Sequence, residues 1–168
     1  MTTNLDTIVA IYSENPGTDI DWSALEAAKS DWSALEAAAK TGDVNLADAA
    51  LVENRNGEVL ILQRDSHHGW GQGAVVGAVV GILFPPTIVG AAAVGAGGGA
   101  LVARLRRSLD KGKVKDLGET LKNGAMAIIV VSPFQSTNAI CNTLKGSNTT
   151  TIVPSTTVEE VQEVMRGL

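Results

Sequence analysis

Few residues of this chain are of a type that does chemistry, and their spacing gives little support for a reaction. The two histidines, His67 and His68, are adjacent, and adjacent residues do not face each other on a helix or a strand. Asp65 is the carboxylate nearest to them and Cys141 is the single cysteine, so neither a zinc site nor an internal disulfide is expected. We expect Cys141 to be a small, reduced side chain rather than a nucleophile.

Two glycine-rich segments superficially resemble nucleotide-binding loops. Gly95–Gly99 lacks both the strand–loop–helix context and the Lys-Ser/Thr ending of a phosphate loop. Gly71-Gln72-Gly73 has no acidic partner about 20 residues further on, as a dinucleotide site requires. The chain also lacks the Gly-x-Ser-x-Gly and His-Glu-x-x-His motifs. We therefore expect no catalytic residue, no metal and no cofactor, and a protein that is not an enzyme.

The distribution of charge is more informative than any of these motifs. The 168 residues include 18 acidic and 13 basic ones, yet no charged residue occurs between Asp65 and Arg104. Pro85-Pro86 interrupts this uncharged block, and tandem prolines cannot lie inside a regular helix. We expect two helical arms of roughly 17 residues, each about 25 Å long, which is slightly short for a hydrocarbon core of about 30 Å. The block is thus predicted to be a hairpin whose ends return to the same side.

Small residues recur every four positions along both arms of this hairpin. They are Gly73, Gly77 and Gly81 on the first arm and Ala91, Gly95, Gly99 and Ala103 on the second. Such spacing lets helix backbones approach closely, whereas glycine costs about 1 kcal/mol per position in a water-exposed helix. The pattern indicates tight packing in apolar surroundings, and these are either a membrane or the core of a soluble oligomer.

A basic run follows the uncharged block, with Asp110 as its opposing charge. It comprises Arg104, Arg106, Arg107, Lys111, Lys113 and Lys115. Basic residues beside an apolar segment favour the cytoplasmic side and anionic lipid head groups, and Trp70 at the other end suits an interface. A solvated helix end is the alternative interpretation of the run. The net charge of −5 argues against nucleic acid as a partner.

The rest of the chain alternates between strand and helix patterns. The first elements are a strand over 7–13 and a helix from Asp19 or Asp21 to about Lys40, which Thr41-Gly42 ends. Strands over 48–54 and 58–63 joined at Asn56-Gly57, a helix over 114–122 and a strand over 125–132 follow. This order predicts an α+β fold of the ferredoxin-like type, an antiparallel sheet with helices on one face. The body then comprises 1–65 and 108–168, and the hairpin is inserted over 66–107.

The expected body has a C-terminal extension after the strand over 125–132. It contains a helix over 136–144, a strand over 149–153 and a last helix that begins near Thr156. The extension either adds an edge strand or reaches a neighbouring subunit.

The first helix contains an exact internal repeat with a period of ten. Asp21–Ala28 has the same eight residues as Asp31–Ala38. Trp22, Leu25, Ala28, Trp32, Leu35 and Ala39 fall on one helical stripe. We therefore expect both tryptophans to lie in the core.

Several short motifs occur in an order that resembles a known family. They are the strand Ile8–Tyr12, Asp48–Val52 with Asn56-Gly57, the block opening at Trp70-Gly71 and centred on Gly81–Phe84, Asp116–Gly118, Gly124–Ala127 and Thr150–Ser155. The chain resembles the bacterial family of predicted membrane proteins called domain of unknown function 1269, although the duplicated helix departs from its pattern. The resemblance implies a ferredoxin-like body carrying a glycine-zipper hairpin. It implies no activity and no functional residues.

We expect a non-enzymatic structural protein that is membrane-associated or self-assembling and that forms homo-oligomers through the hairpin. The first residues show no secretory signal, so the body is expected in the cytoplasm, with lipid as a candidate partner. Two alternatives stay open. One is a small-ligand sensor with a ferredoxin-like fold, whose ligand is unknown. The other is a soluble cytoplasmic particle whose hairpins form a buried apolar core.

Overall fold

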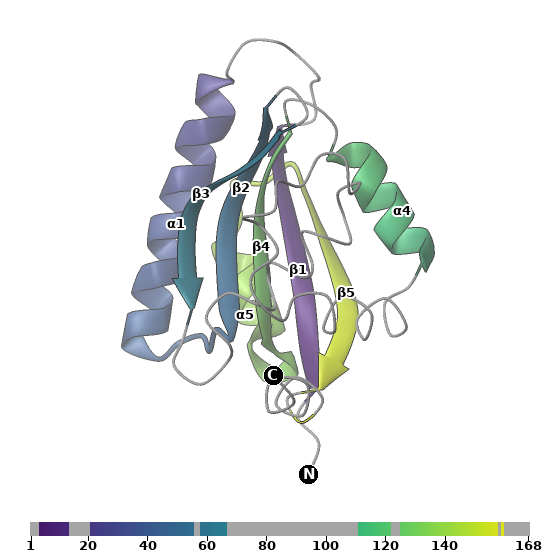
Figure 1. Ribbon diagram of the computed structural model, residues 1–168. Coiled ribbons are helices and arrows are strands. Elements are labelled where there is room, and N and C mark those ends of the chain that lie inside the picture. Colours follow the sequence, from purple (N-terminus) through teal and green to yellow (C-terminus); the bar gives the residue numbers. More distant parts are fainter. Residues whose placement is uncertain are drawn as a thin grey trace.

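The computed structural model describes residues 4–13, 21–55, 58–66, 111–121, 125–157 and 159. They form a five-stranded antiparallel sheet with helices packed against it (Figure 1), which confirms the expected α+β class. The strands are β1 (Asn4–Ser13), β2 (Asp48–Arg55), β3 (Glu58–Ser66), β4 (Met126–Pro133) and β5 (Thr149–Thr157). The helices are α1 (Trp22–Thr41), α4 (Lys111–Thr120) and α5 (Thr137–Thr143), and a 3-10 turn, Phe134–Ser136, precedes α5.

The strands lie in the order β3-β2-β4-β1-β5. Two β-α-β units, β1-α1-β2 and β4-α5-β5, are therefore interlocked. Strand β4 separates the two strands of the first unit, and β1 separates those of the second. The strand over 125–132 was expected to close the fold, followed by an extension that adds an edge strand or reaches a neighbouring subunit. The first alternative is confirmed, because β5 pairs with β1 at the edge of the sheet. With α5, β5 completes the second unit, whereas β3 and α4 lie outside both units.

The position of β4 explains its composition. Every residue of Met126–Pro133 is buried, because strands flank β4 on both sides and its two faces are both covered. Strand β3 is also apolar over its first half, but it lies at an edge of the sheet, and Leu62, Gln63 and Arg64 are exposed. The pattern of the sequence located both strands without showing which of them is central.

Helix α1 begins and ends at local signals that the sequence analysis identified. The Oδ1 atom of Asp21 accepts a hydrogen bond from the backbone N–H of Ala24 at 3.0 Å and caps the first turn. Gly42 has a φ of 82°, the left-handed conformation that glycine adopts without strain. Its N–H donates to the carbonyl of Ala39 at 3.3 Å.

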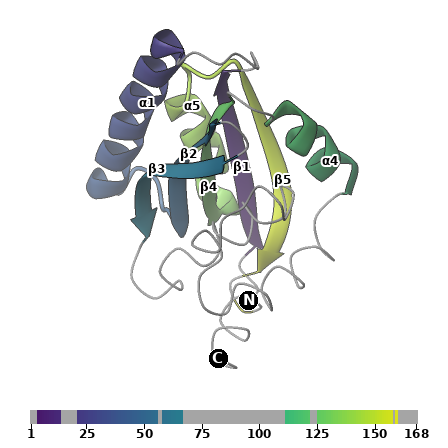
Figure 2. The same ribbon diagram turned by 45° about the horizontal axis from the view of Figure 1, so that its top comes forward.

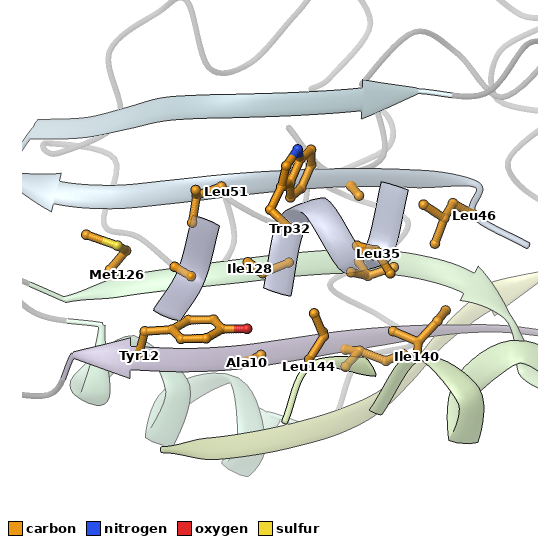
Figure 3. Packing of buried hydrophobic residues seen from close by; sticks show 14 of the residues in the cluster. Ala10, Tyr12, Trp32, Leu35, Leu46, Leu51, Met126, Ile128, Ile140 and Leu144 are labelled. Atoms are coloured by element: carbon orange, nitrogen blue, oxygen red, sulfur yellow. The ribbon is translucent and has the colours of Figure 1, made fainter. Parts of the chain in front are cut away.

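Helices α1 and α5 cover the same side of the sheet, which we call the helix face (Figures 1 and 2). Alternate strand residues point into this core, with Tyr12 from β1, Leu51 from β2 and Ile128 from β4 (Figure 3). Trp32 and Leu35 of α1 pack against them, together with residues of and after α5. The further members of the cluster are Ile8, Ala10, Ala24, Ala28, Val44, Leu46, Ala49, Met126, Val130, Ile140 and Leu144.

One expectation about this core is wrong. Trp32 is 3% exposed, but Trp22 is 66% exposed and lies outside the core. A shift of ten residues at 100° each falls about 80° short of whole turns, so the two copies of the repeat face different directions. Leu25 is half-buried and lies at the edge of the stripe. Ala28 and Leu35 are buried, as expected.

Two element boundaries also differ from expectation. Helix α4 begins at Lys111 rather than at 114, and β5 continues to Thr157, where a helix was expected to begin near Thr156. Apart from Ser66 at the end of β3, the hairpin expected over 66–107 lies outside the described residues. Among the helices that the structure describes, none has the length and apolar character needed to cross a bilayer.

Candidate functional site

Most of the site residues expected from the sequence lie outside the described residues. These are the packing residues Gly73, Gly77, Gly81, Ala91, Gly95, Gly99 and Ala103, the turn Pro85-Pro86, and Arg104, Arg106 and Arg107. His67, His68 and Trp70 also lie there. In the part of the chain that is described, no three His, Cys, Asp or Glu residues are grouped so as to hold a metal ion.

The second half of the basic run forms the beginning of α4. Lys111, Lys113 and Lys115 are all exposed, and the first turn of the helix carries no acidic residue. The Nζ atom of Lys113 donates to the carbonyl oxygen of Ile152 at 3.3 Å, which joins α4 to the edge strand β5 (Figure 1). Cations at the N-terminus of a helix oppose its dipole at a cost of about 0.3–1 kcal/mol each. This arrangement concentrates positive charge at the point where the uncharged block rejoins the body.

A second polar cluster links α1 to β1 and to the loop before β5. The Oδ2 atom of Asp31 accepts a hydrogen bond from the hydroxyl of Tyr12 at 2.8 Å and another from the N–H of Gly146 at 2.8 Å. Asp31 is buried, although it sits in the middle of a helix. A Cβ atom on Gly146 would lie 3.0 Å from Oδ2 of Asp31, so glycine permits the close approach. Asp31 thus fixes three segments that are far apart in the sequence.

The environment of Tyr12 determines what this cluster can do chemically. Burial raises the pKa of the Tyr12 phenol far above its usual range, and the hydrogen bond to Asp31 and the charge of Asp31 raise it further. Tyr12 therefore stays protonated and acts as a hydrogen-bond donor. Asn148 adds two contacts: its N–H donates to the carbonyl of Ile11 at 2.7 Å, and its side chain donates to that of Tyr12 at 3.2 Å. The cluster holds the end of β1 in place.

A third cluster lies at the other end of β1. The hydroxyl of Thr137, the first residue of α5, donates to Oδ2 of the buried Asp6 at 2.8 Å. Asp6 is opposite Ser132 in the pairing of β1 with β4. Burial and, secondarily, the charge of Asp6 raise the pKa of the Cys141 thiol. Because the thiolate is the reactive form, this environment makes Cys141 a poor nucleophile.

Sequence reasoning missed the residues of these two clusters. Asp6, Tyr12, Asp31 and Thr137 form contacts across 19 to 131 positions, and no local motif connects them. One signal was present in Asp31, since aspartate is unfavourable in a helix interior unless its side chain has a partner.

The fold is that of an α+β protein in which two interlocked β-α-β units form one antiparallel sheet. The chain belongs to the family described as Protein of unknown function (DUF1269), whose family model matches residues 71–168, more than half of the chain. The matched part begins in the uncharged block and includes α4, β4, α5 and β5. No curated protein and no solved structure matches the chain.

Proposed function

We propose that this protein is a non-enzymatic structural protein that self-associates through the uncharged block between β3 and α4. The observation that carries the proposal is where this block is inserted. It connects β3 to α4, the two elements that lie outside the interlocked β-α-β units. The described core of the helix face takes its residues from β1, α1, β2, β4, α5 and the loops next to them. In this proposal the apolar residues of the block pack against other copies of the chain.

The body has the ferredoxin-like arrangement in this proposal. The order β5-β1-β4-β2, with a helix after β1 and another after β4, corresponds to two split β-α-β units with both helices on one face. The connection between β2 and β4 is a short turn in the simplest version of such a fold. Here it carries β3, the uncharged block and α4, so the block is inserted into that connection.

Glycine spacing supports copies of the block as the packing partners. Gly73, Gly77 and Gly81 leave a shallow groove along a helix, which allows another helix to approach its backbone. A substitution by leucine fills such a groove. An alanine-to-leucine substitution next to the groove adds somewhat less volume and leaves the groove open.

Size measurement in detergent-free buffer tests the proposal. Light scattering after gel filtration is expected to give a multiple of the 17.4 kDa chain mass for the wild-type protein. The double variant Gly77→Leu/Gly81→Leu is expected to give a smaller assembly, whereas the matched control Ala74→Leu/Ala78→Leu keeps the wild-type size. A monomeric wild-type protein, or equal sizes for all three proteins, would contradict the proposal.

Association with a membrane surface is the second candidate function, and the exposed lysines at the start of α4 favour it. Each basic residue near an anionic surface contributes about 1 kcal/mol of attraction at low salt. Flotation with vesicles containing phosphatidylserine is expected to recover the protein, and Lys111→Gln/Lys115→Gln is expected to reduce recovery. Equal recovery with neutral vesicles would show that these lysines do not direct binding.

A further inference from the structure

The side of the sheet opposite to the helix face is as deeply buried as the helix face itself. We call it the second face. Its described apolar members, together with Thr7, are each 2% exposed or less: Leu5, Val9, Ile11, Ala50, Val52, Ala127, Ile129, Val131 and Val153. None of them belongs to the core formed with α1 and α5. Their burial therefore requires a cover on the other side of the sheet.

The described elements are too small to supply this cover. Helices α1 and α5 lie on the helix face, and α4 lies beside β5 at the edge of the sheet (Figures 1 and 2). With strands about 4.8 Å apart and a rise of about 3.3 Å per residue, four strands of eight residues present a surface about 20 Å by 26 Å. Helix α4 has ten residues and is about 15 Å long.

The uncharged block has the size and composition that the second face requires. It lies within residues 67–110, between the end of β3 and the beginning of α4, and every other segment outside the described residues is shorter than twelve residues. Two helical arms of roughly 17 residues side by side measure about 25 Å by 20 Å, which matches the surface of the sheet. The block also brings no charge onto the apolar strands.

We infer that the uncharged block docks on the second face of the sheet of its own chain. In the helix expected for the first arm, Val75, Val79 and Leu83 fall on the side opposite to Gly73, Gly77 and Gly81. The larger side chains pack on the strands, and the small-residue stripe stays on the outer side. The inference does not depend on self-association, because a monomer also needs its second face covered.

Photo-crosslinking in the full-length protein tests this placement. Phe84 is replaced by p-benzoylphenylalanine, and normal and heavy-isotope chains are mixed so that mass spectrometry separates crosslinks within a chain from those between chains. Crosslinks within a chain to peptides of β1 or β4 are expected. Crosslinks mainly between chains, or to added lipid, would overturn the inference. Trp22→p-benzoylphenylalanine, on the exposed side of α1, is the matched control and is expected to give no crosslink to residues 67–110.

Thiol labelling provides a second readout that needs no crosslink. In a Cys141→Ser chain, Thr7→Cys places a thiol on the second face, and Ser23→Cys places one on the exposed side of α1. Maleimide is expected to modify the thiol at position 7 at least about 100-fold more slowly than the thiol at position 23. A buried thiol reacts only when the folded structure around it opens. The protection is expected to persist on dilution and without lipid. Loss of protection on dilution would assign the cover to a second copy and overturn the inference.

Discussion

The two copies of the repeat in α1 share eight consecutive residues and have different roles. In the first copy Asp21 caps the helix and Trp22 is 66% exposed. In the second copy Asp31 is buried beneath Tyr12 and Gly146, and Trp32 is 3% exposed. The role of a residue in this repeat therefore depends on the direction in which its side chain points and on how deeply it is buried. It does not depend on the neighbours within the repeat, which are identical. Substitutions at matched positions of the two copies measure the effect of location alone.

The tryptophan pair is expected to give the largest contrast. Trp32→Ala removes a buried ring that packs in the helix-face core and whose Nε1–H donates to Glu36 at 3.0 Å. We expect a loss of about 3–5 kcal/mol in the free energy of unfolding, measured by urea denaturation. Trp22→Ala changes an exposed side chain and is expected to stay within about 0.5 kcal/mol of wild type. Equal losses in the two variants would show that the copies are equivalent after all.

The aspartate pair should give the next largest contrast. Asp31→Ala leaves the Tyr12 hydroxyl and the Gly146 N–H buried without their acceptor, which is expected to cost about 3 kcal/mol in chemical denaturation. Asp21→Ala removes one cap and is expected to cost about 1 kcal/mol. Asp31→Asn retains a carbonyl oxygen as acceptor and should fall between them. A larger loss of unfolding free energy in Asp21→Ala than in Asp31→Ala would contradict the role of the buried carboxylate.

The pH dependence of the free energy of unfolding tests the role of the buried cluster around Tyr12 and Asp31. Tyr12 is the single tyrosine of the chain, and its raised pKa means that the folded state keeps a proton that the unfolded state loses near pH 10. Its contribution is fully present below about pH 10, and above that stability falls by about 1.4 kcal/mol per pH unit. Tyr12→Phe removes this component. Absorbance titration of the native protein should show no phenolate below pH 11, and a normal tyrosine titration would contradict the geometry.

The smallest expected effect concerns Gly146. A Cβ atom there would lie 3.0 Å from Oδ2 of Asp31 and would push the carboxylate away from its donors. Gly146→Ala is expected to cost about 1 kcal/mol in urea denaturation. In an Asp31→Ala chain the same substitution should cost almost nothing, because the contact is gone. If Gly146→Ala lowers the free energy of unfolding equally in the Asp31→Ala chain and in the wild type, the strain does not come from the contact with Asp31.

Local signals predicted the elements of this fold well. Asp21 and Gly42 marked the two ends of α1, and the apolar run over 125–132 marked β4. Their arrangement was harder to predict, because a run that is apolar on both faces does not reveal its neighbours. The Asn56-Gly57 signal correctly joined β2 to β3. The contact of Asp31 with Gly146 spans 115 positions, and no local motif in either segment predicts it.

The interlocked strand order has a consequence for fragments of this protein. The family match covers residues 71–168 and contains β4, α5 and β5, but β1 lies between β4 and β5 in the sheet. Of the described strands, a polypeptide cut to that range would keep β4 and β5, and the backbone groups of both strands that pair with β1 would lose their partners. The boundary of the match is therefore not a folding boundary. The N-terminal ten-residue strand must be retained, or supplied as a peptide in trans, for the C-terminal half to assemble.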